Sequence, residues 1–245
     1  MTISLAAEPI FHIGSFPITN TLISSWIAMG VLIGISLILR RKIREVPRGL
    51  QNAVEAIFEV LLNLMDSVTG DRAKSKQYFP LITTILLFII TANWMGLLPG
   101  FGPIGIYEMH HGEEVLVPFF RSSNSDLNVT LALAIISVLS MQFFGILAIG
   151  FVKYSKRFVN FRNPIMGFVG IVEFISDISK VLSFSFRLFG NVFAGEVLLV
   201  IVASLVPLIA PIPFYFLEIF VGFIQAFVFA ILTLVFIKIA SLEPH

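Results

Sequence analysis

Cysteine is absent from the 245-residue chain, and charged side chains are scarce. The lack of cysteine excludes disulfide bonds, thiolate catalysis, cysteine-bound zinc and iron–sulfur clusters. Asp, Glu, Lys and Arg together make up 13% of the residues, about half the share that is usual in soluble domains. The formal net charge of +1 leaves no broad basic surface for nucleic acid, so we expect no nucleic-acid partner.

What the chain has instead is an excess of apolar side chains. They make up 57% of the residues, with 26 Phe among them, and the mean hydropathy is +0.97. A soluble domain with so few charges could not cover its surface with polar groups, so the composition predicts a membrane protein. Residues 1–16 lack the positive segment of a cleavable secretory signal, and we expect the chain to be mature from Met1.

Charge-free apolar runs locate the membrane helices, since a spanning helix needs about 20 mostly apolar residues. They predict three spans near 21–39, 79–98 and 127–151, followed by two longer helices near 166–206 and 213–242. Residues 50–68 place apolar side chains on one helical face and polar ones on the other, which indicates an amphipathic helix at the membrane interface or beneath a partner. The sequence therefore predicts a single all-α, polytopic membrane domain over residues 1–245.

Loop charges predict the orientation of these spans, because cytoplasmic loops carry an excess of Lys and Arg. Basic residues gather at 40–48, 72–76 and 153–162, whereas the connection at 99–126 holds four acidic residues against Arg121 alone. We therefore expect the N-terminus outside and the C-terminus inside.

The last two predicted helices are too long for an upright crossing. Residues 166–206 contain no proline and would form a helix of about 60 Å, whereas the hydrocarbon layer is roughly 30 Å thick. Pro207, Pro211 and Pro213 then mark a turn, after which residues 213–242 return as a second helix. The pattern predicts a long, strongly tilted C-terminal helical hairpin.

Ionisable side chains inside this hairpin are candidates for function, since each is costly to place in a membrane. Glu173, Lys180 and Arg187 are seven residues apart and follow nearly one helical face. Glu196 lies about 180° around the same helix from Arg187, at roughly 100° per residue, and Glu218 lies near the start of the return helix. We expect Glu196 and Glu218 to share one wet outer cleft and partly to substitute for each other.

A purely structural role stays open for some of these charges. Asp177 and Lys180, near the inner interface, could form a local salt bridge or extend toward water. Arg187 is far from either loop and stays charged in a protein, so it must meet a carboxylate, water or another subunit.

Two segments of the hairpin carry a specific motif, LSFSFRLFGNVFAGE at 182–196 and EIFVGFIQAFVFAILT at 218–233. Together with RGLQN at 48–52, TANWMGLLPG at 91–100 and DLNVT at 126–130, they resemble subunit a of the F-type ATP synthases. The resemblance implies a stator subunit that moves protons through two half-channels at its interface with the rotating ring of c subunits, so that the proton-motive force drives ATP synthesis. Nucleotide chemistry would lie on other subunits, so we expect no enzyme activity and no cofactor here.

Carried over position by position, the resemblance makes Arg187 the essential arginine that keeps the two half-channels apart. The outer half-channel would use polar residues of both hairpin helices and of the start of a neighbouring helix, namely Asn191, Glu196, Glu218, Gln225, Asp126 and Asn128. The inner half-channel would use Glu173, Asp177 and Lys180. Bacterial relatives often have His where this chain has Glu218, so the outer path here would rest on two carboxylates.

The resemblance also implies partners and a location. The partners would be the c-subunit ring, b-type peripheral stalk subunits, the rest of the synthase and membrane lipid. The location would be the inner membrane of a bacterium. The choice between protons and sodium ions would lie with the ring carboxylate and its neighbours.

Other functions have less support in the sequence. The alternative is a stand-alone secondary transporter or channel, although such folds often contain internal repeats and none is present here. No G-x-S-x-G or metal-ligand motif supports an intramembrane hydrolase. GFGPIG at 100–105 follows a span and opens no βαβ unit, MHHGEE at 109–114 lacks the H-E-x-x-H spacing, and Asn128-Val-Thr130 fits a glycosylation sequon only at the mouth of a span.

Overall fold

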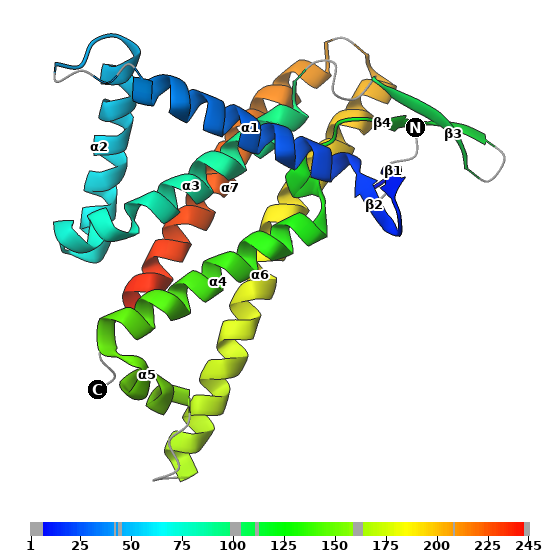
Figure 1. Cartoon of the computed structure of the whole chain (residues 1–245). Coiled ribbons are helices and arrows are strands. Elements are labelled where there is room, and N and C mark those ends of the chain that lie inside the picture. The colour runs from blue at the N-terminus through cyan, green and yellow to red at the C-terminus, as the bar shows by residue number, and fades with distance from the viewer. Residues whose placement is uncertain are drawn as a thin grey trace.

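The computed structural model describes residues 7–41, 43, 46–98, 104–110, 113–158, 164–207 and 209–242. Within these residues the chain is predominantly helical, which confirms the predicted all-α class (Figure 1). The helices are α1 (Asn20–Arg41), α2 (Leu50–Thr69), α3 (Arg72–Gly96), α4 (Leu127–Ile149), α5 (Phe151–Phe158), α6 (Pro164–Leu205) and α7 (Pro211–Ala240). A short 3-10 turn, η1 (Ser123–Ser125), precedes α4.

Five helices of the described part are long and apolar enough to cross a membrane: α1, α3, α4, most of α6, and α7. Of these, α6 runs for 42 residues and α7 for 30 residues. At 1.5 Å per residue, α6 is about 63 Å long, which is twice the thickness of the hydrocarbon layer. The helix in the structure is therefore much longer than an upright crossing of the hydrocarbon layer requires.

Two small antiparallel hairpins flank the helical bundle. Strands β1 (Pro9–Ile13) and β2 (Phe16–Thr19) pair just before α1, and strands β3 (Gly105–His110) and β4 (Glu113–Pro118) pair in the connection between α3 and η1. Neither hairpin was predicted from the sequence, because short strands outside the helical bundle carry no long periodic signal. In Figure 1 both hairpins project from the same end of the bundle.

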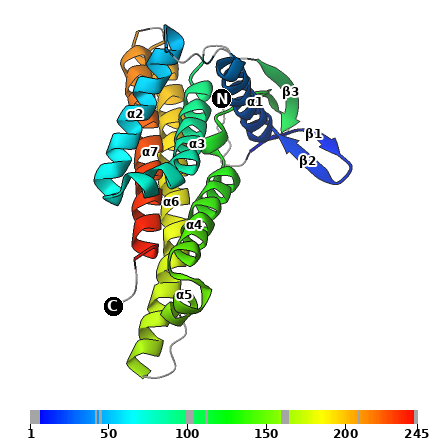
Figure 2. The same cartoon turned by 60° about the vertical axis from the view of Figure 1, so that its left-hand side comes forward.

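The bundle core is built from two closely packed helix pairs, α3 with α7 and α4 with α6, which lie side by side in Figures 1 and 2. Ile82 of α3, Leu188 of α6 and Leu234 of α7 are fully buried in it. Ser137 of α4 and Thr233 of α7 share a buried hydrogen bond of 2.7 Å. Small residues and hydroxyl pairs of this kind allow apolar helices to approach closely within a membrane.

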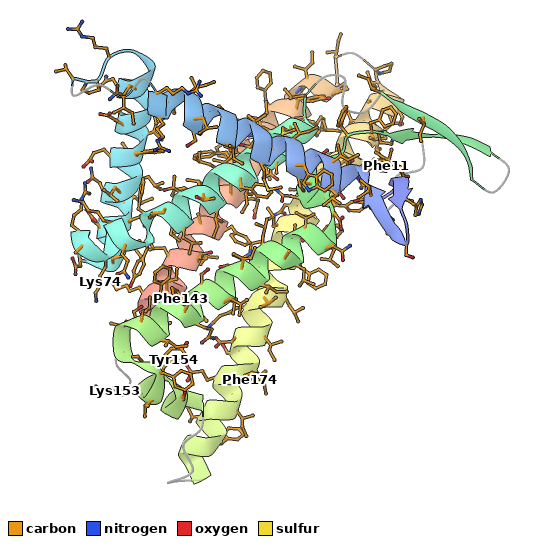
Figure 3. All side chains as sticks on the ribbon, viewed as in Figure 1. Phe11, Lys74, Phe143, Lys153, Tyr154 and Phe174 are labelled. Carbon is orange, nitrogen blue, oxygen red and sulfur yellow. The ribbon has the colours of Figure 1, made fainter. Side chains whose placement is uncertain are left out.

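The N-terminal half of α6 reaches past the rest of the bundle and is accompanied there by α4 and by the short helix α5 (Figure 1). Gly150, at φ 85°, ends α4 and allows the chain to turn sharply into α5. Tyr154 of α5 lies where α4, α5 and α6 meet (Figure 3). Its ring packs against Gly145 of α4, where an added Cβ atom would collide with the ring. Phe174 of α6, also labelled in Figure 3, is 58% exposed.

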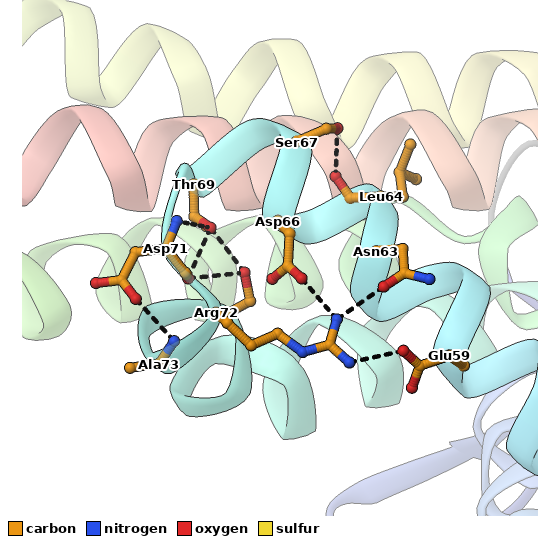
Figure 4. A network of polar contacts seen from close by, with 10 residues as sticks. Glu59, Asn63, Leu64, Asp66, Ser67, Thr69, Asp71, Arg72 and Ala73 are labelled. Atoms are coloured by element: carbon orange, nitrogen blue, oxygen red, sulfur yellow. Dashed lines mark hydrogen bonds and ion pairs between the residues drawn. The ribbon is translucent and has the colours of Figure 1, made fainter.

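The amphipathic helix α2 is joined to α3 by a network of charged side chains (Figure 4). Gly70, at φ 74°, turns the chain so that Arg72 comes back under α2. The Arg72 guanidinium donates to Asp66 at 2.6 Å, to Asn63 at 2.9 Å and to Glu59 at 2.8 Å. The polar face predicted for residues 50–68 is therefore hydrogen-bonded to Arg72 at the start of α3.

Hydrogen bonding also sets the charge state at this junction. Donation from the Ser75 hydroxyl, and then from Arg72, lowers the pKa of Asp66 below its ordinary value. The carboxyl group is consequently ionised at neutral pH. Because the network is largely exposed to water, it orients α2 against α3 more than it stabilises the fold.

Candidate functional site

A cavity of about 220 Å³ lies between α3, α6, α7 and the segment that leads into η1. Its wall is apolar over most of its area, with polar side chains from every one of these elements. The polar lining residues are Asn93, Arg121, Ser122, Asn191, Glu196, Tyr215, Glu218 and Gln225. Four of the six residues predicted for the outer half-channel, all those of the hairpin, thus meet in one cavity.

The cavity contains an ion pair that the sequence analysis did not predict. Arg121 donates from Nε to both carboxylate oxygens of Glu196, at 3.0 and 3.1 Å. Its guanidinium also lies 5.9 Å from the ring centre of Phe193, one helical turn before Glu196. The Arg121 side chain is only 5% exposed, whereas the Glu196 side chain is 31% exposed, so the pair is buried on its arginine side alone. The sequence had marked Arg121 only as the single cation of an acidic outer connection.

Polar contacts hold the segment of Arg121 in place from two sides. The Arg121 backbone N–H donates to the Ser24 hydroxyl of α1 at 3.3 Å. The next residue, Ser122, donates its hydroxyl to the Ala92 carbonyl of α3 at 3.2 Å. Its Cβ packs against Gly96, where any side chain would collide with it. These contacts therefore fix the backbone at Arg121 and at the residue that follows it.

A second set of buried amides connects this segment to α7. Asn124 of η1 donates to the Asn93 side-chain oxygen at 2.7 Å, and Asn93 in turn donates to the Gly222 carbonyl at 2.9 Å. Asn93 packs directly against the Cα side of Gly222. The cavity wall is thus one hydrogen-bonded unit that runs from η1 through α3 to α7.

Glu218 of α7 lines the same cavity as Glu196. Its carboxylate lies against α6 at Gly195, where an added Cβ atom would collide with the carboxylate oxygens. Within the described residues no hydrogen bond to the Glu218 carboxylate is found, in contrast to Glu196. Gln225 lies two turns farther along α7 and lines the same cavity.

Asp126 and Asn128, the other two residues predicted for the outer path, do not line this cavity. Asp126 caps α4: its Oδ1 accepts from the Asn128 backbone N–H at 2.8 Å and from the Asn128 side chain at 3.1 Å. Its Oδ2 accepts from the Thr21 hydroxyl of α1 at 2.8 Å. The structure therefore shows a buried Asp126 that joins α1 to the start of α4, and an exposed Asn128 beside it.

Arg187 lies on the exposed surface of α6. Among the described residues it forms no ion pair, and its hydrogen bond runs from Nη2 to the Ser183 hydroxyl at 3.5 Å, which is long. Its neighbour Leu188 is fully buried, so the helix at this point has one face in the core and the other open. A guanidinium in this position is available to a group from outside the chain.

The residues predicted for the inner side form a separate cluster on α6. Asp177 accepts from Lys180 at 2.6 Å and from the Gln142 amide of α4 at 2.6 Å. Tyr154 of α5 donates to the Gln142 side-chain oxygen, which extends the chain of hydrogen bonds to a third helix. The local salt bridge between Asp177 and Lys180, one of the two alternatives, is present. Glu173 is half-buried one turn closer to the N-terminus of α6.

No group of three or more His, Asp or Glu side chains that could hold a metal ion is found among the described residues. The side chains of MHHGEE at 109–114 lie outside them, as do residues 100–103 of the GFGPIG segment.

Comparison with known proteins identifies the family of this chain. The family model described as ATP synthase A chain matches residues 22–238. The chain is 36% identical to ATP synthase subunit a of Gloeobacter violaceus, over 92% of this chain and 85% of that protein. It is 37% identical to ATP synthase subunit a 1 of Syntrophotalea carbinolica over 90% of this chain and 85% of that protein, and 35% identical to ATP synthase subunit a of Campylobacter jejuni over 86% of each.

The chain belongs to the ATP synthase A chain family. It is accordingly an integral membrane protein and a subunit of the proton-translocating membrane part of an F-type ATP synthase. The matched residues contain α3, α4 and α6 whole and nearly all of α1 and α7, together with the cavity, the inner cluster and Arg187. Arg121, which the sequence analysis did not assign, also lies within the matched residues.

Proposed function

We propose that this chain conducts protons through two half-channels that meet at a rotating ring of c subunits. The observation that carries the proposal is the layout of α6. Its exposed Arg187 stands between an outer cavity at Glu196 and an inner cluster at Lys180. These two residues lie about 13.5 Å and about 10.5 Å along the helix from Arg187, at 1.5 Å per residue. Two polar regions with one fixed cation between them suit a proton path that must not run straight through the chain from one side of the membrane to the other.

In the proposed cycle, a proton enters from the outer side through the cavity lined by Asn191, Glu196, Glu218 and Gln225. It neutralises a carboxylate of the ring, which then turns into lipid. Asp126 and Asn128 belong to this outer side by bracing the start of α4 beside the cavity. A neutral carboxyl group can face lipid at low cost, whereas a charged one cannot.

After nearly a full turn, the ring carboxylate reaches the inner side and releases its proton near Glu173, Asp177 and Lys180. The resulting anion then meets Arg187, which remains charged at every step because a guanidinium does not lose its proton in proteins. Each elementary charge that crosses 100 mV supplies about 2.3 kcal/mol. Several protons per turn are therefore needed for ATP synthesis, which we place on other subunits.

The proposed partner surface is the open face of α6. In an apolar stretch of 18 residues of α6, only 11% of the residues are buried within the chain, against 44% in the corresponding stretch of α3. The large apolar side chains left exposed there include Phe174, Ile178, Leu182 and Phe186. We assign this face to the ring. Since α6 is about 63 Å long, we propose that the α6–α7 hairpin lies strongly tilted, with the N-terminus outside and the C-terminus inside a bacterial inner membrane.

The proposal predicts a specific companion in mild detergent. Purified through a tag on this chain, the complex is expected to contain a ring of small two-span subunits together with b-type stalk subunits and the nucleotide-binding subunits. Mass spectrometry of the intact complex identifies them. A chain that purifies alone, or as a homo-oligomer that transports ions, would instead be a stand-alone transporter.

A further inference from the structure

A second, smaller cavity lies where the end of α2, the start of α3 and the end of α7 meet, at the opposite end of α3 from the outer cavity. Its volume is about 30 Å³. No carboxylate of the described residues lines it. The lining consists of two lysines, three residues with hydroxyl groups and one leucine, namely Thr69, Lys74, Tyr78, Lys238, Ser241 and Leu242.

This basic cavity runs from the surface into the bundle. Thr69 and Tyr78 are buried, whereas Lys74 and Leu242 are exposed. Figure 3 shows Lys74 beside the turn between α2 and α3. The Tyr78 and Ser241 hydroxyls lie 3.4 Å apart and join the start of α3 to the end of α7. A ligand could therefore enter past Lys74 and reach hydroxyl groups deeper in the cavity.

The two lysines of the basic cavity have no carboxylate partner within the described part of the chain. Lys238 donates to the Val68 carbonyl at 2.5 Å, which uses one of its three N–H donors. Lys74 forms no hydrogen bond or ion pair with any described residue. The carboxylates of Asp66 and Asp71, at the α2–α3 turn, accept from a guanidinium and from the backbone of α3 instead. Two positive charges are therefore available to an anion from outside the chain.

The position of the basic cavity indicates which anion it meets. The helices α3 and α7 are both long enough to cross a membrane, and they pack against each other. The cavity lies at the start of α3 and at the end of α7, and the ends of spanning helices lie at the level of the lipid head groups. Lysines at this level attract anionic lipids, and basic pockets between membrane helices bind their head groups.

We propose that the basic cavity binds the phosphate group of an anionic phospholipid, with Lys74 and Lys238 as its two cations. A space of about 30 Å³ holds roughly two water-sized groups, so it admits phosphate oxygens while the rest of the lipid stays outside. Phosphatidylcholine suits the site less well, because the same two lysines repel its choline cation. The site is separate from the proposed proton path, and its test does not depend on that path.

The test is the rate at which an uncharged acylating reagent modifies Lys74 in the complete complex, followed by peptide mass spectrometry. The complex is placed in vesicles of phosphatidylcholine alone, or of equal parts phosphatidylcholine and phosphatidylglycerol. Lys76, which is exposed but does not line the cavity, is the internal reference for general effects of an anionic surface. We expect the ratio of the Lys74 rate to the Lys76 rate to fall about fivefold in the anionic vesicles, the factor for one lysine near an anionic surface.

Two variants test the second cation. Lys238→Gln should abolish the protection of Lys74, whereas Lys238→Arg keeps the charge and should retain it. Because Lys238 also binds the Val68 carbonyl, the amount of assembled complex is measured for each variant. If Lys238→Gln does not assemble, the wild-type comparison between the two vesicles still decides.

An unchanged ratio of the Lys74 and Lys76 rates between the two vesicles would overturn the proposal. Full protection of Lys74 in assembled Lys238→Gln complex would overturn it as well. Inorganic phosphate, added to vesicles of phosphatidylcholine alone, should give no protection. If it protects Lys74 as well as phosphatidylglycerol does, the site binds free phosphate and the assignment to a lipid is wrong.

Discussion

Replacing Arg187 by alanine is expected to reduce ATP synthesis driven by a proton gradient at least about a hundredfold, to the level of membranes without the complex. The reason is electrostatic. Arg187 is an exposed cation between the outer cavity and the inner cluster. In the proposed mechanism, the ring carboxylate could pick up a proton directly from the opposite half-channel if this charge were absent. Protons would then cross without turning the ring. A loss of about 2.7 kcal/mol of coupling corresponds to this hundredfold drop.

Assembly should survive the Arg187→Ala change, because the side chain is exposed and the hydrogen bond that it forms within the described residues, to Ser183, is long. Arg187→Lys should fail as well, since a lysine can lose its proton when it is desolvated and an arginine cannot. Arg48→Ala, at another exposed basic residue outside the membrane-length helices, serves as the control and should synthesise ATP normally. Normal synthesis by Arg187→Ala membranes with assembled complex would show that the charge has no part in coupling.

Gly195→Ala is expected to slow proton-driven ATP synthesis by about tenfold or more, although it adds only one methyl group. The added Cβ would collide with the Glu218 carboxylate, which would have to swing away from α6. A displacement of about 1 Å of a reacting group can cost up to a hundredfold in rate. Since Glu218 is flexible at its far end, we expect the fold and assembly to be kept and the rate to be lost.

The matched control for this change is Gly34→Ala in α1, where an added Cβ meets no other atom within 4 Å. Both changes place a methyl group on a membrane-length helix, so they differ in what the methyl group touches. Steady-state ATP synthesis in inverted vesicles, per assembled complex, measures both. Equal rates for the two variants would mean that the position of the Glu218 carboxylate does not matter.

Composition and spacing were enough to predict the fold class and the principal candidate residue. A long charge-free segment in lipid has to satisfy its backbone hydrogen bonds internally, and a helix does so. The all-α class therefore follows from the sequence. Arg187 stands out because a charge so deep in an apolar run has a high cost. The separation of Glu196 from Arg187 around α6 follows equally from helical periodicity.

The contacts that are distant in sequence could not be predicted in this way. Arg121 and Glu196 are 75 positions apart, and the pairing depends on how η1 is wedged between α1, α3 and α6. In the sequence, Arg121 is simply one cation in a connection with an acidic balance. The two β-hairpins were missed because short strands outside the bundle carry no long periodic signal.

Asp126 shows that the sequence also does not distinguish a structural role from a place in a proton path. Its residue type and its position at the start of a span are compatible with a proton path, and the resemblance supports that role. Only the structure reveals that both of its oxygens accept hydrogen bonds, from the first turn of α4 and from Thr21 of α1. A helix cap and a proton-exchanging carboxylate look alike in a sequence, because an aspartate before an apolar run fits both roles.

The most direct test of the account is the proton conductance of the membrane part itself. Vesicles that contain this chain with its ring, without the nucleotide-binding subunits, are placed under a potassium diffusion potential, and the internal pH is followed with a fluorescent dye. The account predicts rapid proton entry when both the chain and the ring are present, and entry no faster than in empty vesicles when either is omitted. Equal conductance from the ring alone, or no conductance from the two together, would contradict a proton path at their interface.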